Sequence, residues 1–386
     1  MQSLMLSLLI IFSIISLIPL FSKKIRIPVI IIELLIGIIL GKSLLNIIPQ
    51  HQTIEFFASF GLTYLMFIAG IEVDFREVMK NFSKTLSIAL FSIIVPFISG
   101  AMLGFYINVS PLLIGTIFST TSLGLVLPLT KSLKNRPKIK HILLGSVILI
   151  DIISMFILAL SLTILQGSLG FSFLYSFLAI LTLFLIPLLI NKKGLQKKIE
   201  NWMMEKSHFD MEMRFSFALI FLLALVAEHL GFHSIIGAFI AGLIISELTP
   251  KASIIEDKLI SFGYGFFVPL FFILIGAKVN LPLIFSDLSN LFLLAIIIVI
   301  GIFSKVIGVT FISWFEGFSF TDSLGMGFIH SARLSLIIAA VEIGRRAGFI
   351  DLNLFSIFVV LAIVSAIIGP SIGKILLDKR KIKSML

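Results

Sequence analysis

The sequence has no cysteine and few charged residues. Charged side chains make up 13% of its 386 residues, about half of the share in ordinary globular proteins. Without thiols the chain has no disulfide bond, no thiolate metal site and no thiol redox chemistry. Because 59% of the residues are hydrophobic and the mean hydropathy is +1.17, the shortage of charge excludes a soluble enzyme and a cytosolic receptor.

The sequence also lacks the short alternating segments of a transmembrane β-barrel, because its apolar residues come in runs of about 20. A helix of that length crosses the ~30 Å hydrocarbon core of a bilayer. We therefore predict an all-α polytopic membrane protein with about 13 transmembrane helices and no soluble domain. The predicted helices cover residues 3–22, 27–48, 54–71, 84–106, 111–130, 141–165, 171–190, 213–230, 232–247, 260–277, 289–315, 321–345 and 351–377.

The net charge of +10 does not indicate nucleic-acid binding, because the basic residues lie in loops between apolar runs. With the N-terminus outside, 24 of the 30 lysines and arginines fall on the inner side, 4 on the outer side and 2 within helices. Cytoplasmic loops of membrane proteins carry such an excess of basic residues. The asymmetry predicts a protein of the cell membrane with its N-terminus outside and its C-terminus inside. The longest polar segment, residues 191–214, is predicted as an inner surface helix that links two halves, with a flexible loop as the alternative.

Two predicted helices contain helix-breaking and polar residues in their middle. The first has Ser119–Ser122 followed by Gly124 and Pro128, and the second has Gly325–Arg333. These helices are seven apart in the predicted order, so they enter the membrane from opposite faces, as in an inverted repeat. Interrupted helices at matching places in two halves indicate a transporter site, because unwound backbone within a membrane must line a cavity or be buried in protein.

Asp151 lies in a long apolar stretch, with no other charged residue within ten positions on either side. Charge within a bilayer is costly, so such an acid is a functional candidate. We interpret Asp151 as a carboxylate that binds either a proton or a small cation. The alternative is a buried acid that serves only as a salt-bridge partner.

Two basic residues also lie within predicted helices. Lys305 is interpreted either as a cation that competes with the transported ion for the carboxylate or as a structural counter-charge that tethers a broken helix. Arg333 lies beside the second break, and it needs a permanent partner because arginine keeps its charge, which favours a structural role.

The other polar candidates have weaker signals. Glu33 either lines a funnel through which ions reach the site or stabilises helix packing. Glu72 lies near a membrane interface and is a candidate for the same two roles. His330 is interpreted as a packing histidine rather than a proton relay. A metal site at Glu228, His229 and His233 is not favoured, because no fourth ligand is evident.

Pairs of glycines four residues apart are present in two of the predicted helices. Gly37 and Gly41 form one pair, and Gly100 and Gly104 form another. Small residues at this spacing let membrane helices approach closely. We therefore expect helix contacts at both pairs.

Four segments together carry a family resemblance: Glu33–Gly41, Gly61–Glu72, Gly231–Gly242 and Val268–Gly276. With them the chain resembles the monovalent cation:proton antiporter-2 family of bacterial and archaeal sodium/proton and potassium/proton antiporters. The resemblance covers the whole chain. It implies two six-helix inverted repeats with crossed discontinuous helices, a homodimer, and a core that moves against a dimerisation domain.

The resemblance also implies a division of the chain. Residues 1–81 and 213–288 would form the dimerisation domain, residues 82–170 and 289–386 the ion-binding core, and residues 171–212 the linker. In this alignment of roles Asp151 is the ion-binding aspartate, Thr120 and Thr121 are the hydroxyls of the first broken helix, and Lys305 is the membrane lysine.

Two positions depart from the family pattern. Electrogenic members have a second acid directly before the binding aspartate, where this chain has Ile150. The family often has Arg-Gly-Glu in the twelfth helix, where this chain has Arg333, Leu334 and Ser335. The first departure predicts exchange of one proton per cation, which is electroneutral.

The expected function is exchange of a monovalent cation for protons by elevator-like alternating access, with no cofactor and no enzymatic reaction. Na⁺ is the expected cation and would bind at Asp151, because a hard cation prefers oxygen ligands. The alternatives are exchange of K⁺ or Li⁺, a sodium-coupled solute symporter, a channel and a membrane receptor. A symporter would need a roomy polar cavity, and a receptor would need a signalling domain.

Overall fold

The structure, a computed structural model, describes residues 2–25, 27–48, 51–130, 133, 136–165, 167, 178–179, 182–183, 211–248 and 254–378. This part of the chain is helical and contains no β-strand. Nearly all of the predicted linker, residues 171–212, lies outside the described residues. The same holds for most of the polar segment at 191–214.

Seven helical stretches are long and apolar enough to cross a membrane within the described ranges. They are Gln52–Ile71, Phe82–Tyr106, Pro137–Leu165, Ile255–Phe285, Leu288–Phe315, Phe320–Arg346 and Leu352–Leu377. Four shorter apolar helical stretches accompany them, at Leu8–Leu20, Val29–Leu40, Pro111–Leu127 and Ser234–Leu248. The all-helical, membrane-type fold that the sequence predicts is therefore confirmed for the described residues.

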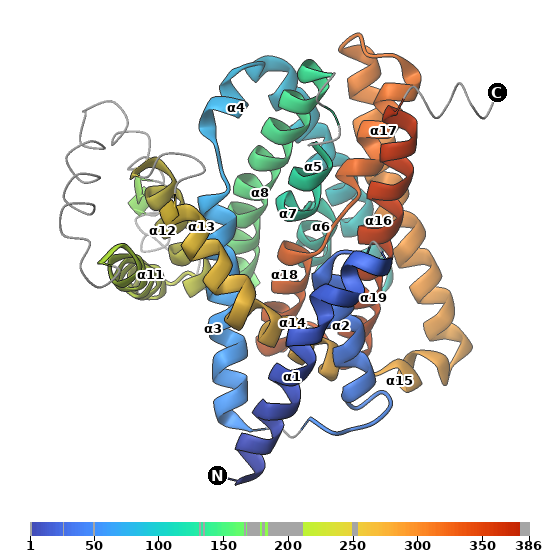
Figure 1. Ribbon diagram of the computed structural model, residues 1–386. Helices are drawn as coiled ribbons and strands as arrows, with labels where there is room; N and C mark the ends of the chain where they lie inside the picture. The colour runs from blue at the N-terminus through green and yellow to red at the C-terminus, as the bar shows by residue number, and fades with distance from the viewer. Residues whose placement is uncertain are drawn as a thin grey trace. The chain divides into compact units, whose positions relative to one another are not determined.

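The chain divides into two compact units, which are described separately. The first comprises residues 1–49, 74–162 and 273–386, and the second comprises residues 50–73 and 163–272. The first unit contains α1 (Gln2–Ile25), α2 (Val29–Leu40), α4 (Phe75–Met79), α5 (Phe82–Tyr106), α6 (Pro111–Ser119), α7 (Leu123–Thr130), most of α8 (Pro137–Leu165), the end of α14 (Val268–Lys278), α15 (Leu281–Phe285), α16 (Leu288–Phe315), α17 (Phe320–His330), α18 (Ser335–Arg346) and α19 (Leu352–Leu377) (Figure 1).

The second unit contains the remaining described helices. They are α3 (Gln52–Ile71), α11 (Met211–His229), α12 (Ser234–Leu248), α13 (Ile254–Phe262), the π-helical turn η2 (Gly263–Phe267) and the first residues of α14. Its helices α3 and α12 touch through backbone. A Cβ atom added at Gly70 would lie 2.2 Å from the carbonyl O of Phe239, and one added at Gly242 would lie 2.1 Å from that of Phe67.

The predicted glycine contacts are confirmed in the first unit. A Cβ atom at Gly37 would lie 2.2 Å from the carbonyl O of Ile273 in α14. One at Gly100 would lie 2.9 Å from that of Ile114 in α6. At both places one helix rests on the backbone of another, as expected where membrane helices pack without large side chains.

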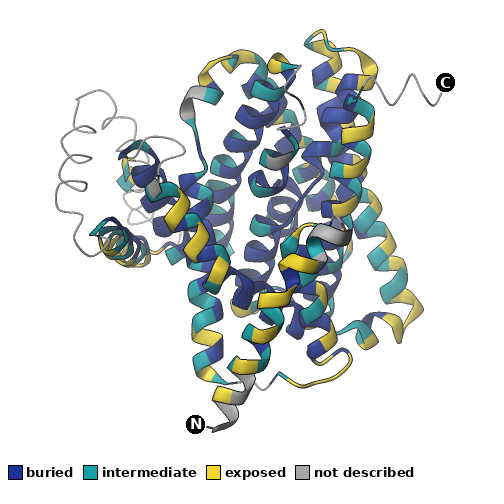
Figure 2. Ribbon diagram, viewed as in Figure 1, coloured by how far each residue is buried: buried dark blue, intermediate teal, exposed yellow. Residues whose placement is uncertain are grey.

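The two interrupted helices lie in the interior of the first unit. Of the 18 most apolar consecutive residues in the stretch Phe320–Arg346, 83% are buried inside the protein, against 39% in Phe82–Tyr106. Figure 2 shows α8 and α18 mostly in the colour of buried residues, whereas exposed residues mark one side of α16. Ser146 and Asp151 of α8 and Glu342 of α18 are therefore buried among neighbouring helices.

Both predicted breaks are confirmed in the structure. The first helix stops at Ser119 and resumes at Leu123, and the second stops at His330 and resumes at Ser335. Side-chain caps fix where the first halves begin: the Ser110 hydroxyl accepts a hydrogen bond from the N–H of Leu113, and the Ser319 hydroxyl accepts one from that of Asp322. Serine is a favoured residue at this capping position.

Candidate ion-binding site

The two breaks lie against each other. The hydroxyl of Thr121 donates a hydrogen bond of 3.1 Å to the carbonyl O of His330. The N–H of Ser122 donates one of 3.1 Å to the carbonyl O of Ala332. Segments about 210 residues apart in the chain thus satisfy each other's backbone groups, which the absence of water in a bilayer makes necessary.

Lys305 of α16 is fully buried and is tied to the end of α6. Its Nζ donates hydrogen bonds of 2.8 Å to the carbonyl O of Ser92 and 2.5 Å to that of Ser119, the last residue of α6. Carbonyl groups at a helix C-terminus have no helical partner and carry partial negative charge. The ammonium therefore neutralises the end of the interrupted helix.

Arg333 approaches the same helix end from the second break. Its Nε donates a hydrogen bond of 3.1 Å to the carbonyl O of Thr120, and its guanidinium carbon lies 5.8 Å from the ring centroid of Phe118. The residue is fully buried, and within the described part of the chain its Nη1 and Nη2 have no hydrogen-bond partner. A second cation is thus held by a backbone carbonyl and an aromatic face.

Asp151 lies in α8 and is only 7% exposed. It is close enough to Lys305 for the two to interact electrostatically. The residue before it, Ile150, packs in an apolar cluster with Ala89 and Ile93 of α5. In the sequence of α5 these two residues lie on either side of Ser92, whose carbonyl O accepts a hydrogen bond from Lys305.

The hydroxyls predicted to serve as ligands are both buried at the first break. Thr120 donates a hydrogen bond of 2.9 Å to the carbonyl O of Ile117, and Thr121 donates to His330 as described. A hydroxyl oxygen that donates its hydrogen still has lone pairs for a cation. The hydroxyls of Ser92 and Ser154 are buried and have no hydrogen-bond partner among the described residues.

The structure thus gathers Thr120, Thr121, Lys305 and Arg333 at the crossing of the breaks. Glu33 lies in α2 and is 3% exposed, and its Oε2 has no hydrogen-bond partner within the described residues. Glu72 is the C-cap residue of α3 and belongs to the second unit. The described residues include no group of three or more His, Asp or Glu side chains arranged to hold a metal ion.

His330 is joined to α8 as well as to the first break. Its Nδ1 lies 2.8 Å from the carbonyl O of Met326, and its Nε2 lies 2.8 Å from the hydroxyl of Ser146. The ring is fully buried. The bond to Ser146 could not be predicted from the sequence, because the two residues are 184 positions apart.

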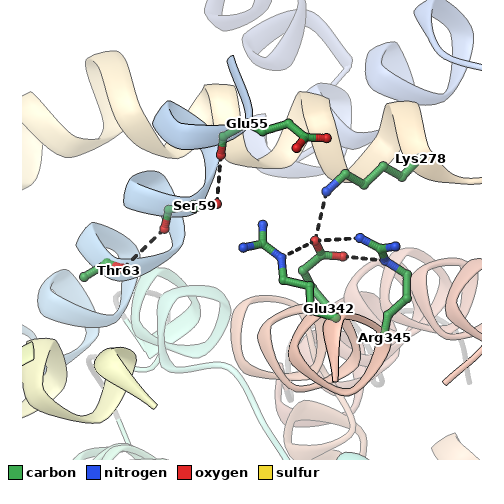
Figure 3. A network of polar contacts seen from close by, with 7 residues as sticks. Glu55, Ser59, Thr63, Lys278, Glu342 and Arg345 are labelled. Carbon is green, nitrogen blue, oxygen red and sulfur yellow. Dashed lines mark hydrogen bonds and ion pairs between the residues drawn. The ribbon is translucent and has the colours of Figure 1, made fainter. Parts of the chain in front are cut away.

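A buried cluster of charges centred on Glu342 was not predicted. This carboxylate in α18 is fully buried and forms ion pairs of 2.9 Å with Lys278, 2.9 Å with Arg345 and 2.8 Å with Arg346 (Figure 3). Its signal in the sequence is the presence of basic residues three and four positions after the acid, a spacing that brings side chains together on one helix face. Lys278 links the end of α14 to α18, whereas Arg345 and Arg346 pair with Glu342 within α18.

The sequence of the chain matches, over residues 10–379, the family described as "Sodium/hydrogen exchanger, transmembrane". It is 32% identical over 372 residues to the Probable Na(+)/H(+) antiporter 3 of Methanocaldococcus jannaschii, covering 95% of this chain and 94% of that protein. It is 27% identical to the Na(+)/H(+)-K(+) antiporter GerN of Bacillus cereus, covering 92% of this chain and 91% of that protein.

The fold is similar to that of the sodium proton antiporter MjNhaP1 from Methanocaldococcus jannaschii. The TM-score is 0.68 over 98% of this chain and 99% of that chain, at 17% sequence identity. This likeness concerns the fold. Because the family match covers almost the whole sequence and a relative above 30% identity covers 95% of it, the chain is a multi-pass membrane protein that belongs to the sodium/hydrogen exchanger family.

Proposed function

We propose that the protein exchanges a monovalent cation, Na⁺ in the first place, for protons at a site centred on Asp151. The names of its relatives support cation/proton antiport. The observation that carries the proposal is the crossing of two broken helices. Backbone carbonyls there hold Lys305 and Arg333, and Lys305 interacts electrostatically with the buried carboxylate of Asp151.

The proposed chemistry is competition for one carboxylate. When Asp151 is protonated, the site holds a proton and the side chain is neutral. When it is deprotonated, the carboxylate binds Na⁺ together with the hydroxyl oxygens of Thr120 and Thr121, because hard cations prefer oxygen ligands. Because the same oxygens cannot hold both ions, cation flux is coupled to proton flux.

We propose electroneutral exchange of one proton per cation, because position 150 holds an isoleucine in an apolar cluster and not a second acid. The two carbonyls of Ser92 and Ser119 accept the hydrogen bonds of Lys305, so the ammonium is stabilised without a second acid at position 150. A lysine that keeps its proton adds no net charge to a complete cycle, because its charge moves equally in both directions. The site then has the same net charge in both loaded states. In one state Asp151 is protonated and no cation is bound, and in the other Asp151 is deprotonated and binds the cation.

The architecture proposed for this function follows the resemblance. It has about 13 transmembrane helices in two six-helix inverted repeats, with the N-terminus outside and the C-terminus inside. Residues 82–170 and 289–386 move as a core by an elevator-like step. Residues 1–81 and 213–288 form the scaffold of a homodimer, and residues 171–212 link the halves. Glu33 would line the ion funnel or stabilise packing, and Glu72 would lie at an interface.

The test is the loss of a pH gradient in vesicles that contain the purified protein, on addition of Na⁺, Li⁺ or K⁺. We expect Na⁺ to dissipate the gradient in the wild type but not in Asp151→Asn. Asp351→Asn is the matched control, since Asp351 caps α19 and asparagine caps a helix equally well. Retained exchange in folded Asp151→Asn would overturn the site.

Two further measurements separate the alternatives. A current that scales with Na⁺ flux would overturn the electroneutral stoichiometry. The name of the relative GerN includes K⁺, so potassium/proton exchange is the second candidate, and a larger response to K⁺ than to Na⁺ would favour it. A requirement for an organic solute would favour the less expected sodium-coupled symporter.

A further inference from the structure

We propose that His330 is a positioning residue that ties α8, the helix bearing Asp151, to the crossing of the two broken helices. The inference deepens the proposed function and rests on it. His330 would touch neither the cation nor the transported proton. It would act through Ser146 and Thr121, by fixing where the carboxylate of Asp151 lies relative to the hydroxyls of the first break.

The hydrogen bonds of the imidazole define its orientation. Nδ1 faces the carbonyl O of Met326 at 2.8 Å, and because a carbonyl can only accept, Nδ1 carries a hydrogen. In the neutral ring Nε2 is then an acceptor, and the hydroxyl of Ser146 at 2.8 Å is its donor. Both nitrogens of the fully buried ring are thus hydrogen-bonded, which fixes the orientation and the position of the ring.

The bond to Ser146 survives a change in the protonation of the ring. The same hydroxyl lies 2.7 Å from the carbonyl O of Ile142, in its own helix. A ring with hydrogens on both nitrogens would donate to Ser146, which would then donate to Ile142. Because either arrangement keeps His330 and Ser146 in contact, the link serves to hold position and needs no titration, even with the charge of Lys305 acting on the ring.

The backbone of His330 makes the second half of the link. Its carbonyl O accepts the hydroxyl of Thr121 at 3.1 Å, so one residue binds the first break by its backbone and α8 by its side chain. Ser146 and Asp151 are five residues apart, which is about 7.5 Å along a helix axis. Together with the packing of Ile150 on α5, the bond at Ser146 sets the rotation of α8 and thereby the direction of the carboxylate.

The experiment measures the KM for Na⁺ and the maximal rate of exchange in vesicles, for wild type, Ser146→Ala, His330→Ala, His330→Gln and the double alanine variant. We expect each single alanine variant to raise KM about 3- to 10-fold, the equivalent of one hydrogen bond, with little change in maximal rate. The double variant should be no worse than the single ones, because both remove the same bond. His330→Gln should restore KM, since its amide oxygen can accept from Ser146.

Ser161→Ala is the matched control. Ser161 lies on the same helix, donates to a carbonyl one turn earlier and contacts the hydroxyl of Thr116 at 2.8 Å, but it does not reach His330. It should leave KM unchanged. The inference would be overturned by an equal rise of KM in this control, or by additive effects of the two alanine substitutions on KM. It would also be overturned if His330→Gln shifted the pH profile of exchange and did not restore KM.

The outcomes also separate this inference from the proposed function. A wild type that shows no cation-driven loss of the pH gradient would overturn the function itself. A second outcome would overturn only the positioning role. In it the wild type exchanges, Asp151→Asn is inactive, and the Ser146 and His330 variants have the same KM as the wild type. Thermal unfolding of each variant in detergent checks that it is folded.

Discussion

Lys305 donates a hydrogen bond of 2.8 Å to the carbonyl O of Ser92, 213 residues earlier in the chain. With its second bond to Ser119, the ammonium joins α16 to α5 and to the end of α6. The lysine therefore holds together three elements that surround the proposed site, and it does so through backbone groups that no substitution can remove.

Replacement of this lysine should lower stability more than replacement of a lysine at the edge of the protein. Lys305→Met leaves two buried carbonyls without their donor, and each hydrogen bond to a charged group contributes about 1.5–3 kcal/mol. Lys84→Met is the control, because its ion pair with Glu316 is partly exposed and such pairs contribute roughly 0.2–1 kcal/mol. Thermal unfolding in detergent measures both. An equal loss in the two variants would contradict the tethering role.

The hydroxyl of Thr121 should matter for cation affinity. Thr121→Val removes a proposed ligand oxygen and the bond to His330, so we expect the KM for Na⁺ to rise at least about threefold, whereas Thr121→Ser should keep both features. Thr130→Val is the control: this threonine is also buried, and among the described residues its hydroxyl bonds to the carbonyl O of Leu127 in its own helix. A KM unchanged in Thr121→Val would exclude the hydroxyl from the site.

Neutralising Glu342 should destabilise the protein by removing the centre of the cation cluster. Glu342→Gln leaves Lys278, Arg345 and Arg346 facing one another, and breaking a buried ion pair costs about 3–5 kcal/mol. The loss of stability should lie at the lower end of this range, because the side chain of Arg346 is 42% exposed and water screens its charge. Unfolding measured at low and high salt, with Glu316→Gln as the control, tests this. A loss no larger than in the control would contradict it.

Stability should depend on pH through Glu77 of α4, which pairs with His141 near the start of α8. Burial raises the pKa of its carboxyl, but hydrogen bonds and charges from Lys80 and His141 outweigh it, so the pKa lies below the ordinary value of 4.5. A carboxyl whose pKa is lowered by folding stabilises the folded state above its unfolded pKa, and this stabilisation is lost as pH falls through the folded value.

The difference in melting temperature between wild type and Glu77→Gln should therefore be largest near neutral pH and shrink as the pH falls below 4.5. Glu55→Gln, which replaces an exposed acid in α3, is the control for general effects of acid. A difference that stays constant, or grows, on acidification would show that the contacts of Glu77 do not favour its charged form.

The sequence predicted the features that depend on local pattern. Long apolar runs predicted helices, and the clusters at Ser119–Ser122 and Gly325–Arg333 predicted the two breaks, because hydroxyls, glycines and a charge are unfavourable within one continuous membrane helix. The glycine pairs predicted close helix contacts for the same local reason. Asp151 stood out by its isolation among apolar residues.

The partners of these residues could not be predicted, because they are set by tertiary packing. Lys305 is held by carbonyl oxygens, which every residue has, so no residue type in the sequence marks Ser92 or Ser119 as its acceptors. His330 was interpreted correctly as buried, but its bond to Ser146 joins distant helices. The cluster at Glu342 was not predicted, because Arg345 and Arg346 are two of the four basic residues assigned to the outer side of the membrane. Their spacing from the acid nevertheless indicates one helix face.

The electroneutral exchange that we propose from the aliphatic surroundings of Ile150 has a consequence for the driving force of transport. A movement that carries no net charge gains nothing from membrane voltage, which would otherwise supply about 2.3 kcal/mol per charge and 100 mV. We therefore expect the direction of exchange to depend on concentrations alone. A difference of one pH unit across the membrane would then sustain a cation ratio of about ten, and a depolarised cell would keep this capacity in full.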